Sequence, residues 1–60
     1  MNNDLTYVNA LLKRYGIYVY NKDKKNMLTL MEMEIKELYN FGLITKEEFT
    51  QALLIIRKRG

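Results

Sequence analysis

Apolar side chains recur at the three- and four-residue spacing of an α-helix in the middle of this chain, and that spacing constrains the fold more than any other feature. The stripe consists of Leu28, Met31, Ile35 and Leu38, and Gly42 follows it as a stop signal. A helix with one apolar face is stable only when that face is buried against another element. We therefore predict a helix here and expect the rest of the chain to supply its packing partners.

Two further segments show the same periodicity. The first helix is expected from about residue 4 to residue 15, with a stripe of Leu5, Val8, Leu12 and Tyr15. The third is expected to begin at about residue 46, after a capping box formed by Thr45 and Glu48. Its stripe consists of Phe49, Ala52, Leu53 and Ile56. The pattern predicts an all-α fold, a three-helix bundle with short connections, in one domain over residues 1–60.

A short run rich in β-branched and aromatic residues, Ile17 to Tyr20, separates the first two predicted helices. Such a run would form a strand if a second strand were present to pair with it, but no other segment of the sequence has strand character. We predict an extended connector whose side chains pack on the helices. A polar loop over residues 21–26 follows, and Asp23 or Asn26 is expected to cap the second helix.

The residue types limit the chemistry. Histidine, cysteine and serine are absent from the sequence, so the usual general base and the two commonest nucleophiles are missing. Glu34 and Glu37 lie three residues apart and could share a divalent cation. No second carboxylate pair completes such a site, so a solvated acidic face is the simpler interpretation. We predict a protein without catalytic activity, cofactor or metal site.

The sequence also predicts a cytoplasmic protein. Residues 1–4 are polar and acidic, whereas a secretory signal would be basic and then apolar. The longest apolar run, Ala52 to Ile56, is far shorter than the roughly 20 residues that cross a membrane. The lack of cysteine is compatible with a reducing compartment.

Positive charge and aromatic side chains gather around the predicted connector. The cations are Lys13, Arg14, Lys22, Lys24 and Lys25. They could contact phosphates, while Tyr18 and Tyr20 offer faces on which unpaired bases stack, a combination suited to single-stranded RNA or DNA. The alternative is that Tyr15 and alternate residues of 17–20 belong to the core and that the lysines only maintain solubility.

Charged residues of the third helix bear on the same hypothesis. Arg57, Lys58 and Arg59 compensate the helix dipole, and they would join the basic patch only if the third helix ends beside the end of the first. An up-down-up bundle predicts that placement. Glu47 and Glu48 occupy the first turn, where a helix that reads duplex DNA needs residues that do not repel phosphate, so duplex recognition is disfavoured.

A rival hypothesis is a protein-interaction or self-association module. Leu54 and Ile55 point to either side of the third stripe, and Met33 lies far from the second stripe. We expect one of Leu54 and Ile55 to lie between helices and the other to lie at an interface. A homo-oligomer would also stabilise a sixty-residue chain that has no disulfide.

Short motifs along nearly the whole chain match those of one known family. They are Leu11-Leu12-Lys13-x-Tyr15-Gly16, the aromatic run Tyr18 to Tyr20, Met31-Glu32-x-Glu34-Ile35-x-Glu37-Leu38-Tyr39-x-x-Gly42-Leu43-Ile44, then Phe49, Ala52 and Leu54-Ile55-x-Arg57. Together they resemble the YqgQ-like family of small bacterial proteins. The resemblance implies a three-helix bundle, and it implies single-stranded nucleic-acid binding, a role proposed for the family without an established biochemical activity. Residues 38–49 also resemble a short helical hairpin found at the C-termini of many bacterial proteins, which implies oligomerisation or docking.

Overall fold

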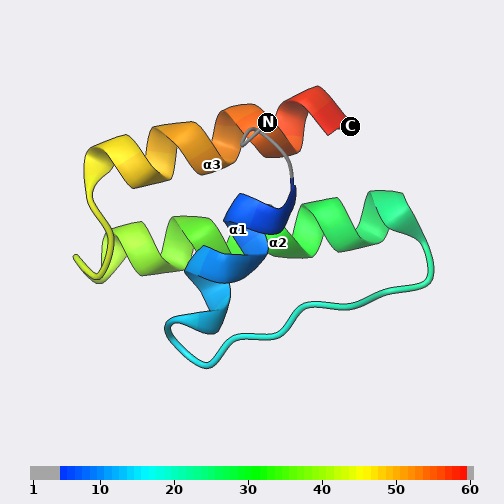
Figure 1. Ribbon diagram of the computed structural model, residues 1–60, viewed down its shortest axis with the longest axis horizontal. Helices are drawn as coiled ribbons and strands as arrows, with labels where there is room; N and C mark the ends of the chain where they lie inside the picture. Colours follow the sequence, from blue (N-terminus) through cyan, green and yellow to red (C-terminus); the bar gives the residue numbers. More distant parts are fainter. Residues whose placement is uncertain (1–4, 60) are drawn as a thin grey trace.

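The computed structural model describes residues 5–59, which form three α-helices without a strand in that range. Helix α1 spans Leu5–Lys13, α2 spans Lys24–Asn40 and α3 spans Lys46–Arg59. Helices α2 and α3 lie antiparallel and side by side, and α1 crosses them on one face (Figure 1). The predicted all-α class and the three helices are confirmed.

The local signals for helix ends act as the sequence predicts. Asp23, rather than Asn26, caps α2, and its carboxylate accepts a 2.9 Å hydrogen bond from the Lys25 backbone N–H. Thr45 and Glu48 form a reciprocal capping box with hydrogen bonds of 3.0 and 3.1 Å. Gly42 follows α2 with φ near 73°, a conformation in which a Cβ is strained. The α2–α3 turn is therefore fixed by its own residues.

The core is built from all three predicted stripes. Its buried side chains are Val8, Leu11, Leu12, Leu28, Met31, Ile35, Leu38, Ile44, Ala52, Ile55 and Ile56. Leu53 and Phe49, also predicted for the core, are half-buried against it. Phe49 stacks on Tyr39 of α2 with ring centroids 4.2 Å apart, which adds an aromatic contact near the turn.

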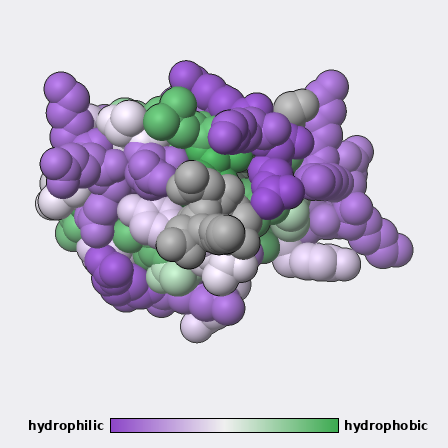
Figure 2. Space-filling view, turned by 45° about the horizontal axis from the view of Figure 1, so that its top comes forward, coloured by the Kyte–Doolittle hydropathy of each residue, from purple (hydrophilic) through white to green (hydrophobic). Residues whose placement is uncertain are grey.

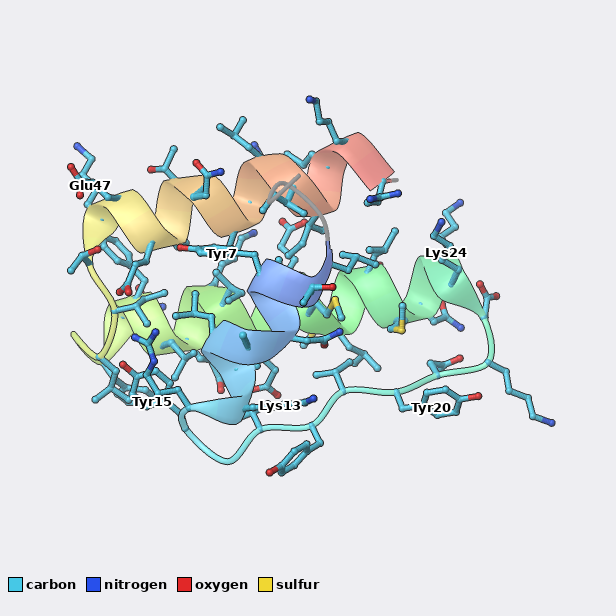
Figure 3. All side chains as sticks on the ribbon, in the orientation of Figure 1. Tyr7, Lys13, Tyr15, Tyr20, Lys24 and Glu47 are labelled. Atoms are coloured by element: carbon cyan, nitrogen blue, oxygen red, sulfur yellow. The ribbon has the colours of Figure 1, made fainter. Side chains whose placement is uncertain are left out.

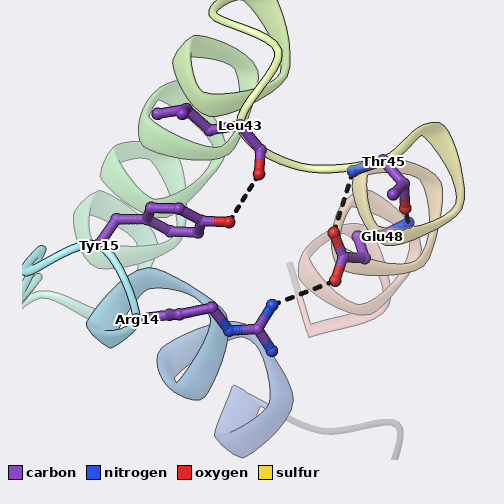
Figure 4. A network of polar contacts seen from close by, with 5 residues as sticks. All are labelled: Arg14, Tyr15, Leu43, Thr45 and Glu48. Carbon is purple, nitrogen blue, oxygen red and sulfur yellow. Dashed lines mark hydrogen bonds and ion pairs between the residues drawn. The ribbon is translucent and has the colours of Figure 1, made fainter.

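The up-down-up arrangement expected from the sequence is wrong. The end of α1 lies beside the start of α3, where the Arg14 guanidinium is 3.4 Å from the Glu48 carboxylate (Figure 4). The Tyr15 hydroxyl donates a 2.6 Å hydrogen bond to the backbone carbonyl of Leu43 in the α2–α3 turn. Helix α1 has 9 residues against 17 in α2, and residues 14–23 form a long connection, so α1 is free to lie across the pair instead of along it.

Of the two residues that flank the third stripe, Ile55 is the one that lies between helices, so it is not exposed to an interface and the interaction hypothesis keeps only Leu54 of the two. Ile55 is 2% exposed and belongs to the same core cluster as Val8 and Leu11 of α1. Its neighbour Leu54 is 57% exposed. Helix α1 packs on α3 as well as on α2, and it covers the side of the third stripe on which Ile55 lies. None of the described helices is long and apolar enough to cross a membrane.

Candidate functional site

The connector, residues 14–23, presents two tyrosines to solvent. After Gly16 its backbone runs extended along the side of α2 (Figure 1). Successive side chains of an extended chain point in opposite directions. Ile17 and Val19 pack against the core, and Tyr18 and Tyr20 are therefore turned outward, with 76% and 81% of their surface exposed. The connector is thus half core and half exposed aromatic surface.

Tyr15 has a structural role. Its ring packs against the core and its hydroxyl is bonded to the Leu43 carbonyl. The alternative interpretation of the aromatic cluster is therefore correct for Tyr15, and for the alternate residues Ile17 and Val19. It does not extend to Tyr18 and Tyr20, which remain available to a ligand.

A groove of about 630 Å³, which we call the end groove, lies between the start of α2 and the end of α3. It is lined by Lys24, Lys25, Leu28, Thr29, Glu32, Ile56, Arg57 and Arg59. Leu28 and Ile56 are buried core residues, so they form an apolar floor. Four cationic side chains surround that floor, and Glu32 is the one carboxylate among the described residues that line it.

The charges of the end groove are mostly uncompensated. Glu32 is 3.0 Å from the Lys36 amine and 4.0 Å from the Arg57 guanidinium. Within residues 5–59, no ion pair joins Lys24, Lys25 or Arg59 to an acidic side chain. Side chains that project from this end of the molecule are hydrophilic (Figure 2, right). The end groove therefore attracts anions.

The structure separates the predicted cations into two groups. Lys13 and Arg14 lie where the connector begins, and Arg14 is engaged by Glu48. Lys24 and Lys25 lie in the end groove where the connector finishes, and Tyr20 and Lys24 are found at the same end of the molecule (Figure 3). Lys22, the remaining predicted cation, is exposed and lies along the chain between Tyr20 and Lys24. The tyrosines therefore lie between two basic regions.

Arg57 and Arg59 join the basic residues Lys24 and Lys25, but at a different place from the one that the sequence argument gave. They were expected to join the patch beside the end of α1, but they lie beside the start of α2. A usable signal was present: two antiparallel helices of 17 and 14 residues joined by a short turn bring the start of one to the end of the other. Lys58 lies on a different side of α3 and lines a second pocket.

That second pocket bears on the interaction hypothesis. It measures about 210 Å³ and is lined, among the described residues, by Gln51, Leu54, Ile55 and Lys58. Leu54 and Met33 are each 57% exposed, as an interface would require, but they lie on different helices and Met33 does not border this pocket. Of the predicted interaction residues, Leu54 and Ile55 therefore border one pocket, and Met33 lies outside it.

The arrangement is suited to binding. Cations and aromatic faces lie along one path, and that path ends at an apolar floor. Among the residues that the structure describes, no three His, Cys, Asp or Glu side chains gather in a way that would hold a metal ion. Glu34 is half-buried and Glu37 is exposed, both on α2.

Comparison with known proteins connects the chain to one family. The YqgQ-like family model matches residues 3–60. The chain is similar to "Uncharacterized protein YqgQ" of Bacillus subtilis (strain 168), with 39% identity over 51 residues that cover 85% of this chain and 72% of the relative. No solved structure matches the chain significantly. The resemblance drawn from the sequence motifs is confirmed.

Proposed function

The chain belongs to the YqgQ-like family, and we propose that it is a non-enzymatic protein that binds single-stranded RNA or DNA. One observation carries the proposal: the connector exposes Tyr18 and Tyr20 on one side and leads into the end groove with its four cations. A single strand needs both features, because its bases stack on aromatic rings and its phosphates require positive charge.

The exposed tyrosines favour a single strand over a duplex. Stacking on an aromatic side chain requires a base whose face is free, and duplex bases cover each other's faces. Each base stacked on a protein ring contributes about 1–3 kcal/mol. Tyr18 and Tyr20 could hold two bases, while Lys22 and the end groove neutralise the adjoining phosphates.

The proposal gives a quantitative expectation for salt. Five cations lie along the second half of the path: Lys22, Lys24, Lys25, Arg57 and Arg59. If each neutralises one phosphate, the slope of log affinity against log salt is about −3.5, and affinity falls about a hundredfold between roughly 50 and 200 mM salt. Fluorescence anisotropy of labelled single strands of about 16 nucleotides, one RNA and one DNA, measures this slope. Absence of binding at the lower salt concentration contradicts the proposal.

The tyrosine contribution has a matched control. Tyr18→Ala and Tyr20→Ala should each weaken binding about five- to a hundredfold. Phe41→Ala removes a ring that is 74% exposed but belongs to the α2–α3 turn instead of the connector, and it should leave affinity unchanged. Equal effects of Tyr20→Ala and Phe41→Ala would show that exposed aromatic rings act without regard to position.

The charges have a matched control of the same kind. Reversal of Arg57 to Glu in the end groove and reversal of Lys58 to Glu on the other side of α3 change the net charge equally. At about 150 mM salt the Debye length is about 8 Å, so distant charges are largely screened. Arg57→Glu should then weaken binding far more than Lys58→Glu.

Self-association is a second candidate, supported by the exposure of Leu54 and Met33. Contacts between apolar side chains persist or strengthen in salt, unlike phosphate contacts. Analytical ultracentrifugation of the wild type and of Leu54→Glu tests it: a dimer that the substitution dissociates supports an interface, and a monomer over the whole concentration range excludes one. A cytoplasmic location stays a prediction from the sequence.

A further inference from the structure

The end groove concentrates more positive charge than one passing phosphodiester balances. Its lining residues include four cations and one carboxylate, whereas Lys22 is the single cation between Tyr20 and the groove. An internal phosphate of a nucleic acid carries one negative charge, but a phosphomonoester carries about 1.5 to 2 at neutral pH and offers three acceptor oxygens. The groove therefore matches a terminal phosphate better than an internal one.

We propose that the end groove is a binding site for the phosphorylated end of a single strand, with the terminal phosphomonoester held among Lys24, Lys25, Arg57 and Arg59. This inference rests on the proposed function and assigns the chemical class of strand that the site selects. Arginine favours such a ligand, since its planar guanidinium can donate two parallel hydrogen bonds to phosphate oxygens.

The floor of the groove supports a terminal nucleotide, not a free phosphate ion alone. Leu28 and Ile56 present apolar surface beneath the cations. The volume of about 630 Å³ falls within the range of roughly 300–1,000 Å³ typical of small-molecule sites. A terminal sugar and base could cover Leu28 and Ile56 while the phosphate remains at the charged rim.

The ion pairs of the groove leave its cations available. Arg57 is 4.0 Å from Glu32, the limit for an ion pair, and Glu32 is closer to Lys36 at 3.0 Å. The side chain of Arg57 is 63% exposed. It can turn toward a phosphate at small cost, because exposed pairs of this kind contribute only about 0.2–1 kcal/mol.

The connector directs a bound strand toward this groove. Tyr18 and Tyr20 are exposed on the same side of the extended segment, and Tyr20 lies at the end of the molecule where α2 begins (Figure 3). A strand stacked on both rings therefore has one of its ends beside Lys24 and Lys25.

Competition experiments test the inference. An internally labelled octanucleotide is bound to the protein at low salt and displaced by unlabelled octamers that end in a 5′-phosphate, a 3′-phosphate or hydroxyls at both ends. One phosphorylated octamer should compete about tenfold better than the hydroxyl octamer, because its end adds up to three charge-assisted hydrogen bonds. Which phosphate gives the gain defines the polarity of the strand.

Variants separate the site from the rest of the surface. Arg57→Gln and Arg59→Gln should abolish the preference for a phosphorylated end, whereas Lys58→Gln should retain it. The double variant Tyr18→Ala/Tyr20→Ala should weaken both kinds of octamer by the same factor, so the ratio between them is preserved. Circular dichroism checks that each variant is folded.

The outcomes distinguish the two proposals. Equal competition by all three octamers overturns the terminal-phosphate inference and leaves single-strand binding intact. A preference that persists in Arg57→Gln and Arg59→Gln overturns the assignment to the end groove. A labelled octamer that fails to bind the wild type at low salt overturns both.

Discussion

Replacement of Glu48 by Gln should destabilise the protein because it removes a charge that makes two favourable interactions. The Glu48 carboxylate accepts a 3.0 Å hydrogen bond from the Thr45 backbone N–H and lies 3.4 Å from the Arg14 guanidinium (Figure 4). Glutamine keeps an acceptor for Thr45 but removes the charge that faces Arg14 and the start of α3. An exposed ion pair contributes about 0.2–1 kcal/mol and a charge at a helix start about 0.3–1 kcal/mol.

The two losses together should lower the free energy of unfolding by about 1 kcal/mol. The ion pair contributes little to this value, because Arg14 is 60% exposed and solvent screens the pair. For a chain of this size, that loss lowers the Tm by about 4–8 °C. Urea unfolding followed by circular dichroism at neutral pH measures the loss in the free energy of unfolding, and thermal unfolding measures the fall in Tm. Glu47→Gln is the control, since Glu47 lies in the same first turn but forms neither bond. Glu47→Gln should lower the free energy of unfolding only by the charge–dipole contribution.

The pH dependence of the same variant is a stricter test. The hydrogen bond from the Thr45 backbone N–H, together with Arg14, lowers the pKa of Glu48 below its usual value. A carboxyl whose pKa is lower in the folded state stabilises the fold above its unfolded pKa of about 4.3, and this stability is lost as the pH falls through the folded pKa. The difference between wild type and Glu48→Gln should therefore shrink at low pH. If the free energies of unfolding of the wild type and Glu48→Gln differ by the same amount at neutral and at low pH, the reasoning is refuted.

Three further predictions follow from the site and the core. Glu32→Gln removes the carboxylate from the end groove and should tighten oligonucleotide binding severalfold in anisotropy titrations at low salt. Ile55→Ala should lower the free energy of unfolding by about 2–5 kcal/mol, whereas Leu54→Ala should change it by less than about 0.5 kcal/mol. The longest dimension of the molecule is 29 Å, so affinity measured with a length series should level off by about eight stacked nucleotides.

Local signals account for what the sequence predicts correctly. The stripe from Leu28 to Leu38, the capping box at Thr45 and the stop at Gly42 depend on residues within one or two turns of each other. Their geometry is the same in any fold that contains the helix. For this reason the helix boundaries and the α2–α3 turn were predictable.

The features that the sequence does not predict depend on how α1 packs against α2 and α3. No pattern within a single helix determines that packing. Whether Ile55 or Leu54 is buried depends on which side of α3 is covered by α1. The same holds for the connector: alternation predicts two faces, but only contact with the core turns Tyr18 and Tyr20 outward. Arg57 was misplaced because the up-down-up expectation for α1 was wrong, although the α2–α3 hairpin alone brings it to Lys24.

The unequal lengths of the two connections have a consequence for folding kinetics. Residues 41–45 join α2 to α3, whereas the connection between α1 and α2 is roughly twice as long, which adds about 0.6 kcal/mol to the entropy cost of closure. The α2–α3 hairpin, whose interface is the most extensive, is expected to form first, and α1 to dock onto it later. Amide hydrogens of α1 should accordingly exchange with solvent faster than those of α2, and a strand bound along the connector would slow that exchange.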